Sequence, residues 1–189
     1  NSLEMLFQEK EIACVIMEEF RNIEPEKSFL KLVRKMCNKK KIVLIFDECT
    51  SGFREYYGGI YKKYKINPDI IMHGKALGNG FPIAAIIGKK KIMKSFHNTF
   101  ISSTFWTENT GAVAALETLK EMKRIKAWNL ITKKGQYIKK NWKKISTKYK
   151  IKIIISGLDA MPKLDFIHRE NNQLKNFLCM EMLKRGFLF

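Results

Sequence analysis

The chain has 189 residues, of which 46% are hydrophobic, enough for one large domain or two small ones with an ordinary core. Its 36 basic residues outnumber its 18 acidic ones and give a formal charge of +18. All but six of the basic residues are lysines scattered along the chain, and no nucleic-acid-binding motif frames them. We therefore expect a solvated, lysine-rich surface and no nucleic-acid partner. No apolar run reaches the roughly 18 residues that a membrane span needs, so we expect no membrane partner either.

The spacing of cysteines and histidines argues against a metal site. The four cysteines, at positions 14, 37, 49 and 179, contain no CxxC pair, and the three histidines lie far apart. No signal peptide is visible, so we expect reduced thiols in a cytoplasmic protein. The sequence begins at Asn1 without a methionine and stops in the apolar run 186–189. We interpret both ends as cuts in a longer chain.

The first strand is predicted at Ile12–Met17, after the tail of a helix within residues 1–10. Glu18 ends this strand, and Arg21 follows closely. Strand-end residues of α/β sheets line ligand crevices, so Glu18 is a candidate for the substrate side of a site. Arg21 is a candidate for binding a substrate carboxylate or another polar group, because its planar fork suits such partners. The alternatives are a strand-end acid that faces water and a solvent-exposed loop arginine.

A helix is predicted next, over residues 26–39, with Pro25 near its first turn. Its apolar residues fall at i, i+3, i+4 and i+7, a spacing that should cover one face of a sheet. These residues are Phe29, Leu32, Val33 and Met36. The apolar run Ile42–Phe46 follows, with the length and β-branching of a buried strand. A strand, helix and strand in this order imply a parallel, largely buried sheet.

An acid and an amine follow two neighbouring strands of this predicted sheet. Asp47 comes directly after Ile42–Phe46, and Lys75 comes after a second apolar run, Asp69–Met72. The glycines at 78 and 80 let the backbone turn tightly and approach a ligand. Because open α/β sheets bind ligands at the carboxyl ends of their strands, we expect Asp47 and Lys75 to face the same crevice.

This pair suits the chemistry of pyridoxal phosphate (PLP). A lysine can form a Schiff base with the cofactor aldehyde, and a buried carboxylate can keep the pyridine nitrogen protonated so that the ring accepts electrons. The alternative is an Asp that caps a turn and one surface lysine among many. Each residue taken singly favours that alternative, whereas the combined pattern favours the cofactor site.

A polar run further along the chain is a candidate for binding phosphate. A strand over residues 81–88 and a short helix over 89–96 precede Ser102, Ser103 and Thr104, whose hydroxyls and amides suit phosphate oxygens. The alternative is an N-cap for a helix that starts at Thr107, and both can hold together. The elements predicted after this run are helix over 110–149 with a break near Lys126, strands at 151–156 and 163–168, and a helix at 171–185.

These segments resemble the class III aminotransferases, fold type I PLP enzymes that include glutamate-1-semialdehyde aminomutase. The resemblance covers residues 12–120 and is most specific at 46–54 and 74–80. The matching segments are Phe46–Arg54, Pro68–Asp69, Gly74–Gly80, Pro82–Ile86 and Ile101–Glu108. The last of them is most similar to the sugar- and polysaccharide-associated branch. The family usually shows Glu-Pro where this chain has Glu18 and Glu19, so Glu19 departs from it.

The resemblance implies a role for each candidate residue. Asp47 would pair with the pyridine nitrogen, and Lys75 would be the Schiff-base lysine and proton shuttle. Thr104, beside Ser103, would donate to the phosphate of the PLP held by the other subunit of a homodimer. The substrates would be a small-molecule amino donor and a carbonyl acceptor.

The resemblance also implies the fold and the domain division. The chain would be α/β, with part of the mostly parallel sheet of a fold type I large domain and its flanking helices, followed by the start of a small α+β C-terminal domain. We place a partial PLP-binding domain at residues 1–120, connecting helices at 121–149 and the start of the small domain, truncated, at 150–189. The family's chains are about twice this long, so the chain is interpreted as an internal or C-terminal fragment.

Three functional hypotheses follow. The first is a class III aminotransferase that transfers an amino group through Lys75, and the second is a 1,2-aminomutase of the glutamate-1-semialdehyde type on the same scaffold. The third is a catalytically inactive fragment whose basic surface binds polyanions. An aminomutase forms product without an external amino donor, and polyanion binding falls steeply with salt and is independent of Lys75.

Overall fold

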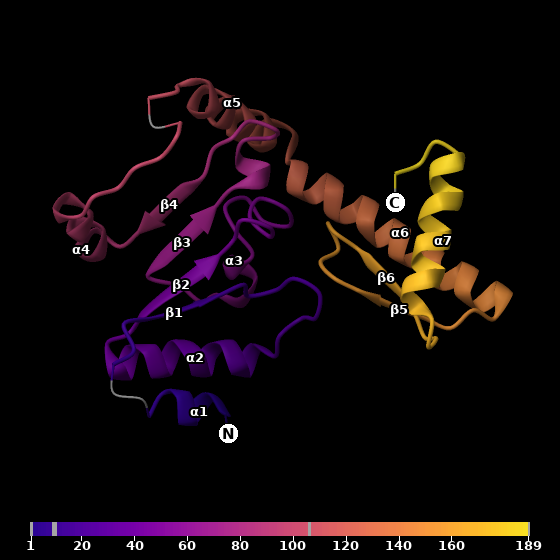
Figure 1. Ribbon diagram of the computed structural model, residues 1–189, viewed down its shortest axis with the longest axis horizontal. Helices are drawn as coiled ribbons and strands as arrows, with labels where there is room; N and C mark the ends of the chain where they lie inside the picture. Colours follow the sequence, from indigo (N-terminus) through magenta and orange to yellow (C-terminus); the bar gives the residue numbers. More distant parts are fainter. Residues whose placement is uncertain (1, 9–10, 106, 189) are drawn as a thin grey trace.

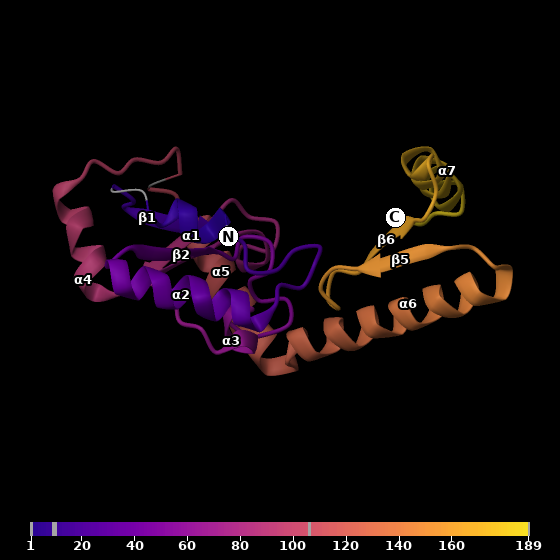
Figure 2. The same cartoon turned by 90° about the horizontal axis from the view of Figure 1, so that it is seen from below.

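A computed structural model of the chain describes residues 2–8, 11–105 and 107–188. It has two sheets, one of four strands near the N-terminus and one of two strands near the C-terminus (Figure 1). A long helix runs between the two parts (Figures 1 and 2). The α/β class expected from the sequence is therefore observed. Trp106, in the segment that resembles the family at 101–108, lies outside the described residues.

The larger sheet is mostly parallel, as expected. Its strands are β1 (Cys14–Met17), β2 (Val43–Asp47), β3 (Ile70–His73) and β4 (Ala85–Gly88), in that order across the sheet. The first three strands run parallel, so their carboxyl ends lie at one edge, and β4 pairs with β3 in the antiparallel direction. Strand β4 begins at Ala85 and not at Phe81, because Gly80, at φ +105°, and the tightly packed turn from Gly78 to Phe81 occupy the preceding positions.

Helix α2 (Lys27–Lys40) crosses from β1 to β2 and covers the sheet. Its buried residues are Leu30, Val33 and Cys37, so the stripe predicted from Phe29 is rotated. Phe29 is 40% exposed, because it flanks the face that packs on Leu44 and Phe46. The helix ends at Lys40 and is capped by Lys41, whose left-handed conformation lets its N–H donate to carbonyls of the last turn.

The remaining elements are mostly short. Helix α1 (Ser2–Leu6) precedes the sheet, α3 (Tyr61–Tyr64) lies between β2 and β3, and the 3-10 helix η1 (Lys75–Leu77) follows β3. After β4 come α4 (Lys90–Met93), η2 (Lys94–Asn98), α5 (Thr110–Ile125) and α6 (Ala127–Tyr149). The predicted break is confirmed at Lys126, which has a φ of 53°. The chain continues with β5 (Ile153–Ser156), β6 (Lys163–Phe166) and α7 (Asn171–Lys184).

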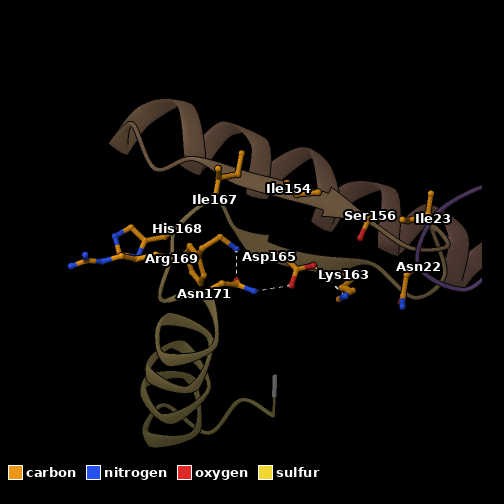
Figure 3. A pocket seen from close by; sticks show the side chains of 11 residues that line it. Asn22, Ile23, Ile154, Ser156, Lys163, Asp165, Ile167, His168, Arg169 and Asn171 are labelled. Atoms are coloured by element: carbon orange, nitrogen blue, oxygen red, sulfur yellow. Dashed lines mark hydrogen bonds and ion pairs between the residues drawn. The ribbon is translucent and has the colours of Figure 1, made fainter.

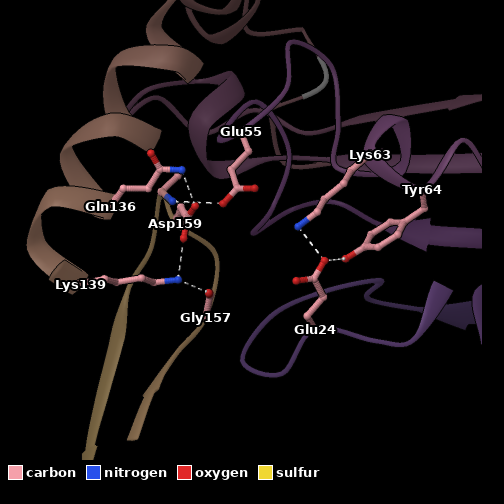
Figure 4. A network of polar contacts seen from close by, with 9 residues as sticks. Glu24, Glu55, Lys63, Tyr64, Gln136, Lys139, Gly157 and Asp159 are labelled. Carbon is pink, nitrogen blue, oxygen red and sulfur yellow. Dashed lines mark hydrogen bonds and ion pairs between the residues drawn. The ribbon is translucent and has the colours of Figure 1, made fainter. Parts of the chain in front are cut away.

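The turn between β5 and β6 joins the two parts of the molecule. Leu158 in this turn is fully buried in the core that contains Phe20, Ile60 and Tyr64. The backbone N–H of Gly157 donates to the carbonyl of Asn22 at 2.8 Å. Figure 4 shows the polar contacts around this junction, where Asp159 accepts from Gln136 and Lys139 on α6 at 2.8 Å each. The loop after β1 is thus held from the C-terminal part of the chain.

The edges of the larger sheet are less buried than a strand–helix–strand unit implied. Ile16 on β1 is 56% exposed, and Ile86 and Ile87 on β4 are 51% and 57% exposed. Within the described part of the chain, β2 and β3 have a strand on each side, and β1 and β4 are edge strands. No helix among the described residues is long and apolar enough to cross a membrane.

Candidate active site

The sheet brings the two chemically distinctive strand ends together. Asp47 is in register with Met72 on the neighbouring strand β3, and the N–H of Glu48 donates to the Met72 carbonyl at 2.9 Å. Lys75 lies two residues beyond the end of β3. The parallel register therefore places a carboxylate and an amine at adjacent strand ends, as predicted.

Lys75 is the first residue of η1 and has a left-handed φ of 38°. Its exposed side chain extends to the loop that follows β2, where Lys75 Nζ donates to Thr50 Oγ1 at 2.7 Å. Gly74 before it packs against Cys49, since a Cβ at Gly74 would lie 3.4 Å from the Cys49 sulfur. The two strand ends are therefore in van der Waals contact at this point.

The surroundings of Cys49 show that Asp47, Lys75 and Glu18 lie near one another. Its backbone N–H donates to Asp47 Oδ1 at 3.0 Å, which fixes that carboxylate. Burial raises the pKa of the Cys49 thiol, the Asp47 carboxylate raises it further, and Lys75 and Glu18 act on it in opposite directions. Asp47, Lys75 and Glu18, from three strand ends, thus act on a single side chain.

Glu18 and Arg21 form an ion pair at the rim. Arg21 Nη1 donates to Glu18 Oε1 at 3.3 Å, and the two side chains are 61% and 30% exposed, Arg21 being the freer. Arg21 is solvent-exposed, as the alternative of a loop arginine predicted, but its guanidinium is also bound to Glu18, the other candidate for the substrate side. The structure therefore groups Glu18, Arg21, Asp47 and Lys75 on one edge of the sheet.

Glu48 holds the loop over the site, a role that sequence reasoning missed. The side chain is fully buried and accepts from Ser51 Oγ at 2.9 Å, Ile60 N at 2.9 Å and Tyr61 N at 3.0 Å. A Cβ at Gly59 would overlap this carboxylate, so glycine is required there. Two features of the sequence could have indicated this role: an acid directly after Asp47, and the glycine pair Gly58-Gly59, which ends eleven residues after Glu48.

His73 was also missed as a site residue. It is 4% exposed, its ring lies 4.9 Å from that of Phe53, and burial lowers its pKa. A Cβ at Gly52 would lie 2.8 Å from His73 Nδ1. The neutral imidazole packs below the loop and supports it, and it does not face the crevice as a charged group.

Ser103 and Thr104 are exposed and lie apart from this cluster. Among the described residues, no hydrogen bond or ion pair joins either of them to Asp47 or Lys75, and Ser103 Oγ only accepts from Phe105 N at 3.4 Å. The expectation that this run caps a helix from Thr107 is wrong. The helix begins at Thr110, whose N–H and hydroxyl both donate to the Glu108 carboxylate.

An open cavity lies elsewhere, over the β5–β6 sheet (Figure 3). It encloses about 850 Å³ and reaches Asn22 and Ile23 at one end. None of the predicted site residues lines it. Its acid, Asp165, is already engaged by Lys163 at 3.3 Å and Lys175 at 2.9 Å. No group of three or more His, Cys, Asp or Glu side chains within the described ranges could hold a metal ion.

The arrangement at the strand ends fits the two PLP contacts that the resemblance implied. An amine is presented for the cofactor aldehyde, and a fixed carboxylate on the adjacent strand is presented for the pyridine nitrogen. Both groups are at the carboxyl edge of the sheet, where such ligands bind.

Comparison with known proteins bears on the family and on the cofactor class. The family described as aminotransferase class-III matches residues 1–189. A 3-aminobutyryl-CoA aminotransferase of Cloacimonas acidaminovorans is 34% identical over 143 residues, covering 75% of this chain and 34% of that protein. A glutamate-1-semialdehyde 2,1-aminomutase of Wigglesworthia glossinidia brevipalpis is 33% identical over 209 residues, covering all of this chain and 48% of that protein.

Solved structures show the same fold. The FumI protein of Sphingopyxis sp. MTA144, in its PLP internal aldimine form, aligns with a TM-score of 0.94 at 23% identity over 100% of this chain and 47% of its own. The ornithine aminotransferase of Plasmodium yoelii aligns with a TM-score of 0.86 at 23% identity over 99% of this chain and 51% of its own. The chain thus spans about a third to a half of the length of these relatives.

Proposed function

The chain belongs to the class III aminotransferase family, which is PLP-dependent, and on this premise we propose that it supplies Lys75 and Asp47 to an amino-group transfer to a carbonyl substrate. The observation that carries the proposal is the parallel register of β2 and β3, which sets the Asp47 carboxylate beside the strand that leads to Lys75. A small-molecule amino donor and a carbonyl acceptor are the proposed substrates.

PLP, when bound, supplies an aldehyde for an amine and a ring that accepts electrons. Lys75 Nζ is the group that would hold the aldehyde carbon, and Asp47 would hold a proton on the pyridine nitrogen. The N–H of Cys49 keeps the Asp47 carboxylate in one orientation. Asp47 therefore presents its other oxygen to a ligand without a side-chain rearrangement.

Lys75 also moves a proton when its amine is free. Thr50 Oγ1 accepts from Lys75 Nζ at 2.7 Å, so this hydroxyl gives the released amine a resting place beside the site. From there Lys75 Nζ would act as a general base and take a proton from the substrate carbon. It would then act as a general acid and give that proton to the cofactor. Arg21 and Glu18 line the rim, where the arginine fork suits a substrate carboxylate.

The outward-facing segment supports a homodimer in this proposal. Phe100, Ile101 and Phe105 are 93%, 45% and 51% exposed, and they flank Ser103 and Thr104. A second copy would cover these apolar side chains, and the Thr104 hydroxyl would then donate to the phosphate of the partner's PLP. The division into a partial PLP-binding domain, connecting helices and a small domain at 1–120, 121–149 and 150–189 belongs to the same proposal. So does a cytoplasmic location, which the free thiols of Cys14, Cys37 and Cys49 suit.

A second candidate is an aminomutase on the same scaffold. Relatives of this name cover all or most of the chain, at 33% and 34% identity in two species. An aminomutase moves the amino group within one molecule, so Lys75 and Asp47 keep the same roles. The difference lies in whether product requires an external donor.

The test is a half-reaction followed by absorbance. We expect the PLP-loaded chain to convert its cofactor to the aminated form with an amino donor, and Lys75→Ala to lose this conversion. Lys90→Ala, an exposed lysine on α4, is the matched control and should retain it. Turnover of an amino aldehyde without any added donor would select the aminomutase. Absence of conversion, with polyanion binding that falls with salt and is the same in Lys75→Ala, would replace both by the basic-surface hypothesis.

A further inference from the structure

A buried carboxyl group lies next to the candidate site and has no role in the proposed chemistry. Glu19, one residue beyond Glu18, is 2% exposed. Neither of its carboxyl oxygens accepts a hydrogen bond from a donor among the described residues, and the side chain within hydrogen-bonding reach of it is that of Glu48, another acid. An ionised carboxylate in such a position is strongly disfavoured. The neutral acid is the form that fits.

The groups that act on Glu19 from the neighbouring elements are acids and phenols. Glu48 and Asp47, at the end of β2, both disfavour a negative charge on it, and Tyr64 of α3 also lies within its field. Lys63 of that helix pairs with Glu24 at 2.7 Å and lies over the Phe20 ring. Burial first and the Glu48 charge second raise the pKa of Glu19 to about 10.

Glu48 is the complementary member of this pair. A carboxylate offers about four acceptor positions on its two oxygens. Three of them are taken by Ser51 Oγ, Ile60 N and Tyr61 N, at 2.9 to 3.0 Å. One acceptor position on the Glu48 carboxylate therefore remains for a fourth donor.

We propose that Glu19 is protonated in the folded chain and donates this hydrogen to Glu48, so that one hydrogen bond ties the loop after β1 to the loop after β2. The first loop carries Glu18 and Arg21, and the second carries Thr50 and follows Asp47, the last residue of β2. Glu19 is thereby a positioning residue, since it sets Glu18 and Arg21 against the end of β2. The positioning role rests on the proposed function, whereas the protonated pair does not.

The neighbourhood of Glu19 shows why the tie matters at this point. Phe20 is buried in one core with Leu158, and the Asn22 carbonyl accepts from Gly157 N–H, so part of the loop is held by the turn between β5 and β6. Glu24, further along the loop, pairs with Lys63 of α3. Glu19 lies on the β2 side of this loop, within hydrogen-bonding reach of Glu48. A hydrogen bond between them would tie the loop directly to the residue that follows β2, in addition to its contacts with α3 and with the turn between β5 and β6.

The test compares thermal unfolding of the wild type, Glu19→Gln and Glu11→Gln between pH 6 and pH 9. The folded state keeps a proton on Glu19 that the unfolded chain releases near pH 4.5, so stability falls as the pH rises. We expect the Tm of the wild type to drop by roughly 8–16 °C relative to Glu19→Gln over this interval. Glutamine keeps a donor but does not titrate. Glu11 is exposed, so Glu11→Gln should follow the wild type. If the Tm of the wild type and that of Glu19→Gln changed with pH in the same way, the proposal would be overturned.

Two further measurements keep the outcome decisive. In wild-type chain labelled with ¹³C at the glutamate carboxyls, we expect one resonance to stay at the protonated position through pH 7; if all of them shift below pH 6, the proposal fails without any variant. For the positioning role, the yield of Lys75 labelling with PLP and borohydride should drop at least threefold in Glu19→Ala and be retained in Glu19→Gln. Equal yields in the wild type and both variants would remove that role. If even the wild type is not labelled at Lys75, the proposed function fails, and the pH profile still decides on the pair.

Discussion

Two regions with candidate site residues differ in how far the chain itself organises them. At the ends of β1 to β3, Asp47, Lys75 and Glu48 each have a polar partner within the chain, at 2.7 to 3.0 Å. In the segment 99–105, Ser103 and Thr104 are exposed and flanked by exposed aromatic side chains. The chain thus builds one part of a site on its own sheet and presents the other part outward. In our account the second part acts only on a partner subunit.

The largest effect should come from breaking the first region at Glu48. Glu48→Ala leaves Ser51 Oγ, Ile60 N and Tyr61 N without their acceptor, and each buried, unsatisfied group costs about 1–3 kcal/mol. We expect the free energy of unfolding to fall by about 3 kcal/mol or more in denaturant titration. Glu48→Gln, the matched control, keeps one acceptor oxygen and should lose less. A loss below about 0.5 kcal/mol in Glu48→Ala, the range of ordinary surface substitutions, would show that the loop is held otherwise.

The next effect concerns ligand affinity without a change in the fold. Asp47→Asn keeps an oxygen for the Cys49 N–H but removes the charge that would pair with the pyridine nitrogen. A hydrogen bond to a charged group contributes about 1.5–3 kcal/mol, so PLP affinity should fall by roughly 10- to 150-fold. Spectral titration with PLP measures this, with thermal unfolding as a check on folding. Unchanged affinity in Asp47→Asn would remove Asp47 from the site.

Thr104→Val tests the outward-facing region. The substitution removes a hydroxyl and keeps the shape, so we expect stability to be unchanged and PLP affinity to fall by roughly 2- to 13-fold, the range of one neutral hydrogen bond. Thr107→Val, three residues along in the same exposed segment, is the control and should bind PLP as the wild type does. The loss should appear only at chain concentrations at which sedimentation shows a dimer. The same loss in a monomer would contradict the assignment to the partner's cofactor.

The smallest effect is expected at Thr50. Its hydroxyl accepts from Lys75 Nζ, but Lys75 is exposed and water can replace this partner. Thr50→Val should therefore slow modification of Lys75 by PLP only about twofold, with stability close to that of the wild type. The rate of borohydride-trapped product measures it. A tenfold or larger effect would mean that Thr50 takes part in the chemistry itself.

The strands and the Asp47–Lys75 pair were predictable because both depend on local signals. Short apolar runs marked β2 and β3, and the parallel register of a strand–helix–strand unit follows from the connection. The stripe of α2 was rotated, because Phe29 and Leu30 are both apolar and only the sheet decides which of them is buried. The domain boundaries and the roles of the site residues stay predictions.

Contacts between residues that are far apart in the sequence could not be predicted from local sequence patterns. Leu158 is separated from Phe20 by more than a hundred residues, yet the two share one core. Glu48 and Glu19 look like surface acids in sequence, and only the packing of three loops shows that both are buried. The helix that follows Thr104 begins later than expected, at Thr110, where Asn109 is the N-cap and the Glu108 carboxylate accepts from the Thr110 N–H and hydroxyl.

The central claim is that this chain presents Lys75 to PLP, and chemical trapping tests it most directly. The purified chain is incubated with PLP, reduced with borohydride and digested, and the modified lysine is identified by peptide mass spectrometry. The thirty lysines of the sequence give the experiment an internal control. The account predicts that Lys75 is labelled well above every other lysine and that Asp47→Ala removes this preference. Labelling spread over the lysines in proportion to their exposure would contradict it.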